Sequence, residues 1–171
     1  MLGLNSLHAY DLAMTRPSWE EYFLKIVDTV SERSTCDRGK AGALIVKDRR
    51  ILSTGYAGSP PGQPHCDEAG HMMRRVVDED DNISQHCVRT IHAEANALIQ
   101  AAKFGTPVEG ATLYSKFEPC YACAMLTVGA GIKRVVARRK YHAAEETRKL
   151  FKNAGVELVV FEDNVMKYEN Q

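Results

Sequence analysis

The sequence predicts an α/β sandwich built around five strands. Helical and strand patterns follow one another in the order α-β-β-α-β-α-β-α-β with short connections, which is typical of a sheet covered by helices. The chain has 171 residues, the size of one domain, so we expect a single domain over residues 1–171 with a core of about 19–161. Apolar residues make up 44% of the chain and charged residues 26%, which is normal for a protein with a buried core.

The first helix is expected over Trp19–Arg33, where apolar side chains recur at helical spacing. Ser18 precedes this segment and Glu21 lies three residues further on, which is the arrangement of a capping box. Two apolar segments then predict a strand at Ala41–Val46 and a second strand at Ile51–Gly55, joined by a charged turn.

Two loops are expected before the second half of the chain. Gly58–Pro64 is rich in glycine and proline and predicts a rigid loop, and the acidic segment around residues 77–85 predicts a solvated one. The remaining elements are predicted as helix His92–Lys103, strand Ala111–Tyr114, helix Cys120–Gly129, strand Arg134–Ala137, helix Ala143–Asn153 and strand Val156–Phe161.

Charge and cysteine content argue against several classes of protein. Lys and Arg number 22 and so do Asp and Glu, and a formal net charge of zero argues against a polynucleotide-binding or anionic-membrane-binding surface. No apolar stretch approaches the ~20 residues of a membrane span, and the N-terminal segment lacks the features of a signal peptide. Five cysteines, an odd number, suit metal binding in a reducing cytoplasm better than a disulfide framework.

The most informative motif is a His-Ala-Glu segment at residues 92–94, separated by 24 residues from a Pro-Cys-Tyr-Ala-Cys segment at 119–123. His92, Cys120 and Cys123 supply three zinc ligands. A structural zinc is usually closed by four protein ligands, whereas a hydrolytic zinc keeps one position for water. Three ligands therefore predict a catalytic zinc, and this spacing is the signature of zinc deaminases that act on cytosine or adenine.

Glu94 is the predicted proton carrier. Zinc lowers the pKa of a bound water from about 15.7 to roughly 7, and Glu94 is placed to move the proton of that water to the ring nitrogen and then to the leaving amine. His92 and Glu94 are expected to open one helix, and Pro119 to occupy the first position of another, so that two helix N-termini favour the thiolates. A zinc-knuckle stabiliser and a redox Cys-x-x-Cys pair are the alternatives, and a redox pair does not explain the His-Ala-Glu segment.

Beyond this motif, the chain resembles the cytidine and deoxycytidylate deaminase superfamily, and within it the deoxycytidylate deaminases, over about residues 19–161. The segments that match are Cys36 with Gly42–Val46, Gly55–Pro60, Gly131–Val136 and Lys140–His142. The resemblance implies a three-layer α-β-α cytidine-deaminase-like sandwich with a five-stranded mixed sheet and one catalytic zinc. It implies hydrolysis of dCMP to dUMP and ammonia, which supplies dUMP for thymidylate synthesis. It also implies a homo-oligomer, often a hexamer, with dCTP as activator and dTTP as inhibitor.

One position departs from the family pattern. Members usually carry Asn after the Tyr of a Gly-Tyr-Asn-Gly loop, where the side chain reaches the sugar hydroxyl, and this chain has Ala57 there. A lost neutral hydrogen bond costs about 0.5–1.5 kcal/mol, so sugar recognition is weaker, comes from the backbone, or lies elsewhere. The candidate nucleotide contacts are Tyr56, Ala57, Ser59, Ala93 and Tyr141. Tyr141 is alternatively a core tyrosine.

The resemblance also implies a second, structural zinc. Several deoxycytidylate deaminases build such a site from the segments that hold the three remaining cysteines, and bacterial relatives have Cys where this chain has His71. The predicted ligands, which would form a closed tetrahedron, are Cys36, Cys66, His71 and Cys87. Such a site would tie the Pro60–Arg89 insertion to the core. Three buried free cysteines, or His65 or His86 as the fourth ligand, are the alternatives. We expect two zinc ions per chain.

Other functions fit parts of the sequence. Ala57 leaves open the deamination of another cytosine nucleotide, dCTP or a 5-modified dCMP. Purine and tRNA-adenosine deaminases share the zinc motif but are typically more basic and lack the three further cysteines. A non-catalytic zinc-bearing protein of the same fold, for example one associated with DNA uptake, would have no need of Glu94.

Overall fold

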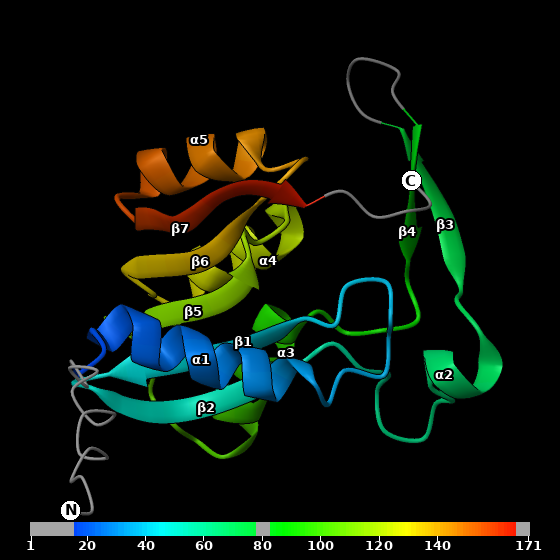
Figure 1. Ribbon diagram of the computed structural model, residues 1–171, viewed down its shortest axis with the longest axis horizontal. Coiled ribbons are helices and arrows are strands. Elements are labelled where there is room, and N and C mark those ends of the chain that lie inside the picture. Colours follow the sequence, from blue (N-terminus) through cyan, green and yellow to red (C-terminus); the bar gives the residue numbers. More distant parts are fainter. Residues whose placement is uncertain (1–15, 78–82, 167–171) are drawn as a thin grey trace, which may run out of the picture.

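The computed structural model describes residues 16–77 and 83–166, and it shows a five-stranded mixed sheet between two layers of helices (Figure 1). The strands of this sheet are β1 (Gly42–Lys47), β2 (Arg50–Tyr56), β5 (Thr112–Phe117), β6 (Arg134–Tyr141) and β7 (Glu157–Met166). They lie in the order β2-β1-β5-β6-β7. β1 runs antiparallel to β2 and β5, whereas β5, β6 and β7 are parallel. The predicted α/β fold with a mixed sheet is confirmed.

Helices cover both faces of the sheet. The helix α1 (Trp19–Ser31) packs on one face, and its capping box between Ser18 and Glu21 is formed as predicted. The helices on the other face are α3 (Ala93–Lys103), α4 (Tyr121–Gly129) and α5 (Glu145–Ala154). None of the helices in the described ranges is both long enough and apolar enough to cross a bilayer.

Alternation along β1 divides the core between the two faces. Leu44 is buried against α1 with Val27, whereas Ala43 and Ile45 are buried in the cluster that contains α3. Gly55 of β2 allows α3 to lie directly on the sheet, since a Cβ at this position would come within 2.3 Å of the α3 backbone. This close contact fixes the start of α3, where the His-Ala-Glu segment lies.

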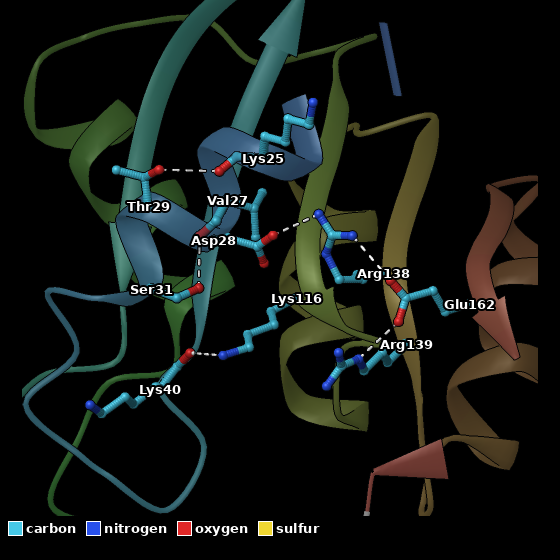
Figure 2. Close-up of polar contacts among 10 residues, drawn as sticks. All are labelled: Lys25, Val27, Asp28, Thr29, Ser31, Lys40, Lys116, Arg138, Arg139 and Glu162. Atoms are coloured by element: carbon cyan, nitrogen blue, oxygen red, sulfur yellow. Dashed lines mark hydrogen bonds and ion pairs between the residues drawn. The ribbon is translucent and has the colours of Figure 1, made fainter. Parts of the chain in front are cut away.

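An ion pair links the sheet to α1, and a hydrogen bond links it to the loop before β1 (Figure 2). Arg138 of β6 contacts Asp28 of α1 at 2.7 Å and Glu162 of β7 at 3.1 Å, so one guanidinium joins three elements. Lys116 of β5 donates to the backbone oxygen of Lys40 at 2.9 Å. This contact holds the loop that follows Cys36 close to the end of β5.

The insertion after β2 has more structure than the sequence predicted. It contains the short helix α2 (Cys66–Ala69) and an antiparallel hairpin of β3 (Met73–Val77) and β4 (Ile83–Cys87), which stands apart from the main sheet (Figure 1). The loop predicted around residues 77–85 is therefore wrong for residues 83–85, and residues 78–82 lie outside the described part. Side chains of β3 are exposed along its whole length, so no alternating apolar pattern marks the strand.

Strand ends also differ from the predictions. β6 and β7 continue to Tyr141 and Met166, beyond the predicted ends at residues 137 and 161. Their outer halves pair through the backbone while most of their described side chains stay partly or fully exposed. An apolar pattern therefore stops earlier than the strand itself.

Candidate metal centres and catalytic cavity

The first Cys/His cluster joins the N-termini of two helices. His92 is the N-cap of α3, Cys120 is the N-cap of α4, and Cys123 lies in the first turn of α4. The Nδ1 atom of His92 is 3.4 Å from the sulfur of Cys120 and 3.5 Å from that of Cys123. A tetrahedral zinc bound at ~2.3 Å to sulfur and ~2.0 Å to nitrogen separates these atoms by about 3.5 Å. The three residues therefore have the spacing that a zinc ion needs.

The structure places Pro119 before the helix rather than at its first position, because Cys120 is the cap residue. The predicted preference for thiolates is found for Cys120 but not for Cys123, whose pKa is raised by its hydrogen bond with Cys120 and by burial. A hydrogen bond with the Cys123 thiol is the main cause that lowers the pKa of Cys120 to about 4, and His92 acts in the same direction. A thiolate is thus favoured at the end of α4 even before a metal binds.

Glu94 lies beside this cluster without belonging to it. Among the described residues, the possible metal ligands of this first cluster are His92, Cys120 and Cys123, and Glu94 is not one of them. Glu94 is only 7% exposed, and burial raises the pKa of its carboxyl above the usual value. A buried carboxyl with a raised pKa next to a three-ligand cluster is suited to carry a proton during a reaction at the fourth position.

Glu94 lines a cavity of about 110 Å³ together with His92 and Cys120 of the cluster. Other groups on its walls come from the loop after Cys36, from β4 and from the ends of β5 and β6. Those that bear on the argument are Arg38, Lys40, Ala57, Gln85, His86, Thr90, Ala93, Glu118 and Tyr141. Ala57, Ala93 and Tyr141 thus line the cavity as the sequence suggested, whereas Tyr56 and Ser59 are not among the lining residues.

The backbone of Ala57 is fully used inside the protein. Its N–H donates to the backbone oxygen of Ala41 at 3.0 Å, and its own carbonyl oxygen accepts from the Thr35 N–H at 3.0 Å and the Ser34 hydroxyl at 2.9 Å. The residue as a whole is 8% exposed, it lines the cavity, and its side chain is a methyl group. Neither the side chain nor the backbone of this residue is available to hydrogen-bond a sugar.

Glu118 was not predicted as part of the site. It lines the cavity, and its side chain is completely buried. Arg148 of α5 donates to both of its oxygens at 2.8 and 2.6 Å, and the Tyr141 N–H donates at 2.9 Å. Thr147 of α5 donates to the oxygen of Pro119 at 3.1 Å. These bonds hold the loop that carries Cys120, and the pairing with α5 gives no local signal in the sequence.

The second Cys/His cluster brings together all four predicted residues, Cys36, Cys66, His71 and Cys87. The sulfurs of Cys66 and Cys87 are 3.6 Å apart, and the sulfur of Cys36 is 3.8 Å from Nδ1 of His71. A tetrahedral zinc separates two sulfur ligands by about 3.8 Å. The other ring nitrogen of His71 contacts the Asp37 carboxylate at 3.0 Å, and an outer carboxylate of this kind orients a metal-binding imidazole.

The two alternative histidines lie elsewhere. Nδ1 of His65 is 3.1 Å from the hydroxyl of Thr35, and His65 is not part of the cluster. His86 lies on β4 next to Cys87 but lines the catalytic cavity instead. Among the described histidines, His71 is therefore the one whose ring nitrogen joins the three sulfurs.

Comparison with known proteins agrees with this geometry. A family model described as the cytidine and deoxycytidylate deaminase zinc-binding region matches residues 17–139. The chain is 39% identical over 160 residues to the ComE operon protein 2 of Bacillus subtilis, covering 92% of this chain and 80% of the relative. It is 44% identical over 125 residues to a deoxycytidylate deaminase of Mycobacterium phage D29, covering 72% and 96%.

A solved structure is similar in both fold and sequence. It is the dCMP deaminase of cyanophage S-TIM5 in complex with dCMP and dUMP, which superposes with a TM-score of 0.67 at 29% identity. The superposition covers 88% of this chain and 98% of the phage enzyme. The likeness therefore extends to nearly the whole of both chains.

Proposed function

Because the chain belongs to the cytidine and deoxycytidylate deaminase family, we propose that it catalyses the zinc-dependent hydrolytic deamination of dCMP to dUMP and ammonia. One observation carries the proposal: a cluster of three zinc ligands opens into a cavity beside the buried carboxyl of Glu94. The deoxycytidylate deaminase of phage D29 and the cyanophage enzyme with dCMP and dUMP support the choice of substrate.

The residues present fit the reaction. Zinc held by His92, Cys120 and Cys123 would supply a Lewis acid that makes water nucleophilic near neutral pH. Glu94 takes a proton from the attacking water and delivers it to N3 of the cytosine ring, then carries a second proton to the exocyclic amine. The bond between C4 and the water oxygen forms, the bond between C4 and the amine breaks, and ammonia leaves.

We assign the second cluster to a structural zinc. Four protein ligands close a tetrahedron and leave no position for water, which is typical of structural sites. The ligands come from the loop after α1, from α2 and its C-terminal flank, and from β4. Such a site ties the hairpin to the sandwich, which explains how a pair of exposed strands keeps a defined place.

We further propose that the protein is a homo-oligomer in which copies cover an apolar surface on α3 and α4. Large apolar side chains there are exposed by 43–75%: Ile99, Phe104, Tyr121, Met125 and Leu126. We propose copies of the chain as the partner that covers this surface, because the family resemblance implies a hexamer. Analytical ultracentrifugation tests the assembly; a monomer at all concentrations would contradict it.

The same family resemblance leads us to propose dCTP and dTTP as effectors. All five thiols are free, which suits a reducing compartment such as the cytoplasm.

Ammonia release from the purified protein tests the function. The substrates are dCMP, dCTP, CMP, deoxycytidine and deoxyadenosine, each with and without dCTP or dTTP as effector. Turnover of dCMP above the others is the expected result, and turnover of none of them would overturn the proposal. Turnover of dCTP instead, or of a 5-modified dCMP assayed in the same way, would be the second candidate function, which Ala57 in the cavity wall leaves open.

A further inference from the structure

Two sets of groups that line the cavity beside Glu94 suit the two ends of a nucleotide. Glu94 and the zinc ligands form the reaction centre, which the cytosine ring must reach. Arg38 and Lys40 supply positive charge, which suits the phosphate of a nucleotide. In a nucleotide the sugar lies between base and phosphate, so the sugar must contact the wall between these two groups.

The wall formed by Ala57 offers the sugar no hydrogen bond. Its side chain has no polar atom, and its N–H and carbonyl are bonded to Ala41, Thr35 and Ser34. A sugar hydroxyl that becomes buried without a partner costs about 1–3 kcal/mol by general experience with buried polar groups. Tight binding of a deoxynucleotide therefore requires a polar group from another wall.

His86 on β4 is a polar residue of another wall of this cavity, and it is half-buried. The same cavity is lined by His92, Cys120 and Glu94 of the reaction centre and by Arg38 of the cationic group. Arg38 donates to the backbone oxygen of Gln85, the residue before His86, at 3.0 Å, so His86 follows directly on a contact of the cationic group.

We propose that His86 hydrogen-bonds the 3′-hydroxyl of the deoxyribose and thereby supplies the sugar contact that Ala57 cannot make. This inference rests on the proposed function. The second Cys/His cluster holds His86 in place, because the next residue is the ligand Cys87 and because Arg38, two residues after the ligand Cys36, donates to the Gln85 backbone oxygen at 3.0 Å. A metal at that cluster therefore shapes the substrate-binding wall as well as stabilising the hairpin.

The test compares dCMP with 2′,3′-dideoxy-CMP, which lacks the 3′-hydroxyl. We expect the wild type to favour dCMP in kcat/KM by roughly 3- to 10-fold, the worth of one hydrogen bond. His86→Ala should remove this preference by lowering kcat/KM for dCMP alone, and His86→Asn or His86→Gln should restore part of it. Arg75→Ala, an exposed position on β3 of the same hairpin, serves as the matched control and should change neither substrate.

Three results would overturn the inference. They are an equal loss with both nucleotides in His86→Ala, a preference that survives in this variant, and a selective loss in Thr90→Val instead. Zinc content is measured for every variant because His86 adjoins Cys87. If the His86→Ala variant loses zinc, the test uses the wild type only. Equal kcat/KM for the two nucleotides in the wild type would then contradict a 3′-hydroxyl contact. Absence of dCMP turnover in the wild type would contradict the proposed function. In that case the role of His86 would be tested by calorimetry, which measures the binding of the same two nucleotides.

Discussion

The two Cys/His clusters use similar ligands but are built in different ways. The first lies on the N-termini of α3 and α4, which pack on the main sheet, whereas the second gathers residues from loops, a one-turn helix and an exposed hairpin. The first has three ligands and a buried carboxyl beside them, and the second has four ligands. The comparison teaches that ligand number and surroundings decide what a zinc ion does. Where the sheet already positions the ligands, one of the four coordination positions of zinc can stay open for water. Where the metal must hold the surrounding segments together, protein ligands occupy all four positions.

The largest expected effect is that of Cys123→Ser, which removes one ligand of the first cluster. We expect zinc content to fall from two ions to one per chain and turnover to become undetectable. The fold should change little, because the frame of α3 and α4 rests on the sheet rather than on the metal. Zinc analysis, ammonia release and thermal unfolding measure the three outcomes. Loss of the folded state would contradict the idea that this frame is preformed.

Glu94→Gln distinguishes the role of the carboxylate from that of the metal at the same site. Both zinc ions should remain, and turnover should fall by about 10²–10⁴-fold, since the amide cannot carry a proton. Glu146→Gln on the exposed surface of α5 is the control and should leave activity unchanged. Activity within a few-fold of the wild type would show that Glu94 is not the proton carrier.

Cys66→Ser tests the second cluster. One zinc ion should be lost, and the free energy of unfolding should fall by about 4 kcal/mol, which is the scale for loss of a metal site. For a chain of this size that corresponds to a decrease in Tm of roughly 8–16 °C. Residual turnover should persist with a raised KM, because His86 is held less firmly. Complete loss of turnover with the first zinc retained would contradict the division of roles.

The smallest effect concerns the sandwich that supports the first cluster. Ion pairing with Arg139 and Arg138 lowers the pKa of Glu162 below its usual value, so its contribution to stability is present above about pH 4.5 and is lost as the pH falls through the lowered pKa. Glu162→Gln should lower stability at pH 7 by about 0.5 kcal/mol, the value of an exposed ion pair, and the difference should vanish in acid. Urea unfolding at pH 7 and pH 3 measures it. A difference that grew on acidification would contradict the pairing.

The sequence predicted the sheet well, and it named the residues of both Cys/His clusters that the structure brings together. The apolar run of β1 and the capping box before α1 are local patterns, and the spacing of His92, Cys120 and Cys123 is typical of zinc ligands. The position of Cys36, Cys66, His71 and Cys87 came from resemblance, and the structure brings all four together.

The parts of the site that were missed depend on tertiary placement. His86 and Gln85 reach the cavity only because a hairpin whose described apolar side chains are exposed is anchored beside it. Glu118 is held by Arg148, thirty positions later in the chain, and neither residue stands out locally. Tyr56 was expected to contact the nucleotide from its loop position, but it ends β2, where its backbone oxygen accepts from the Asn96 side chain.

The most direct test is a crystal structure of the zinc-loaded protein with data collected at the zinc absorption edge. We expect two anomalous peaks per chain. One should lie among His92, Cys120 and Cys123 with a water or substrate atom as its fourth ligand, and the other among Cys36, Cys66, His71 and Cys87 with no exchangeable ligand. A single peak, or Glu94 as the fourth ligand of the first zinc, would contradict it.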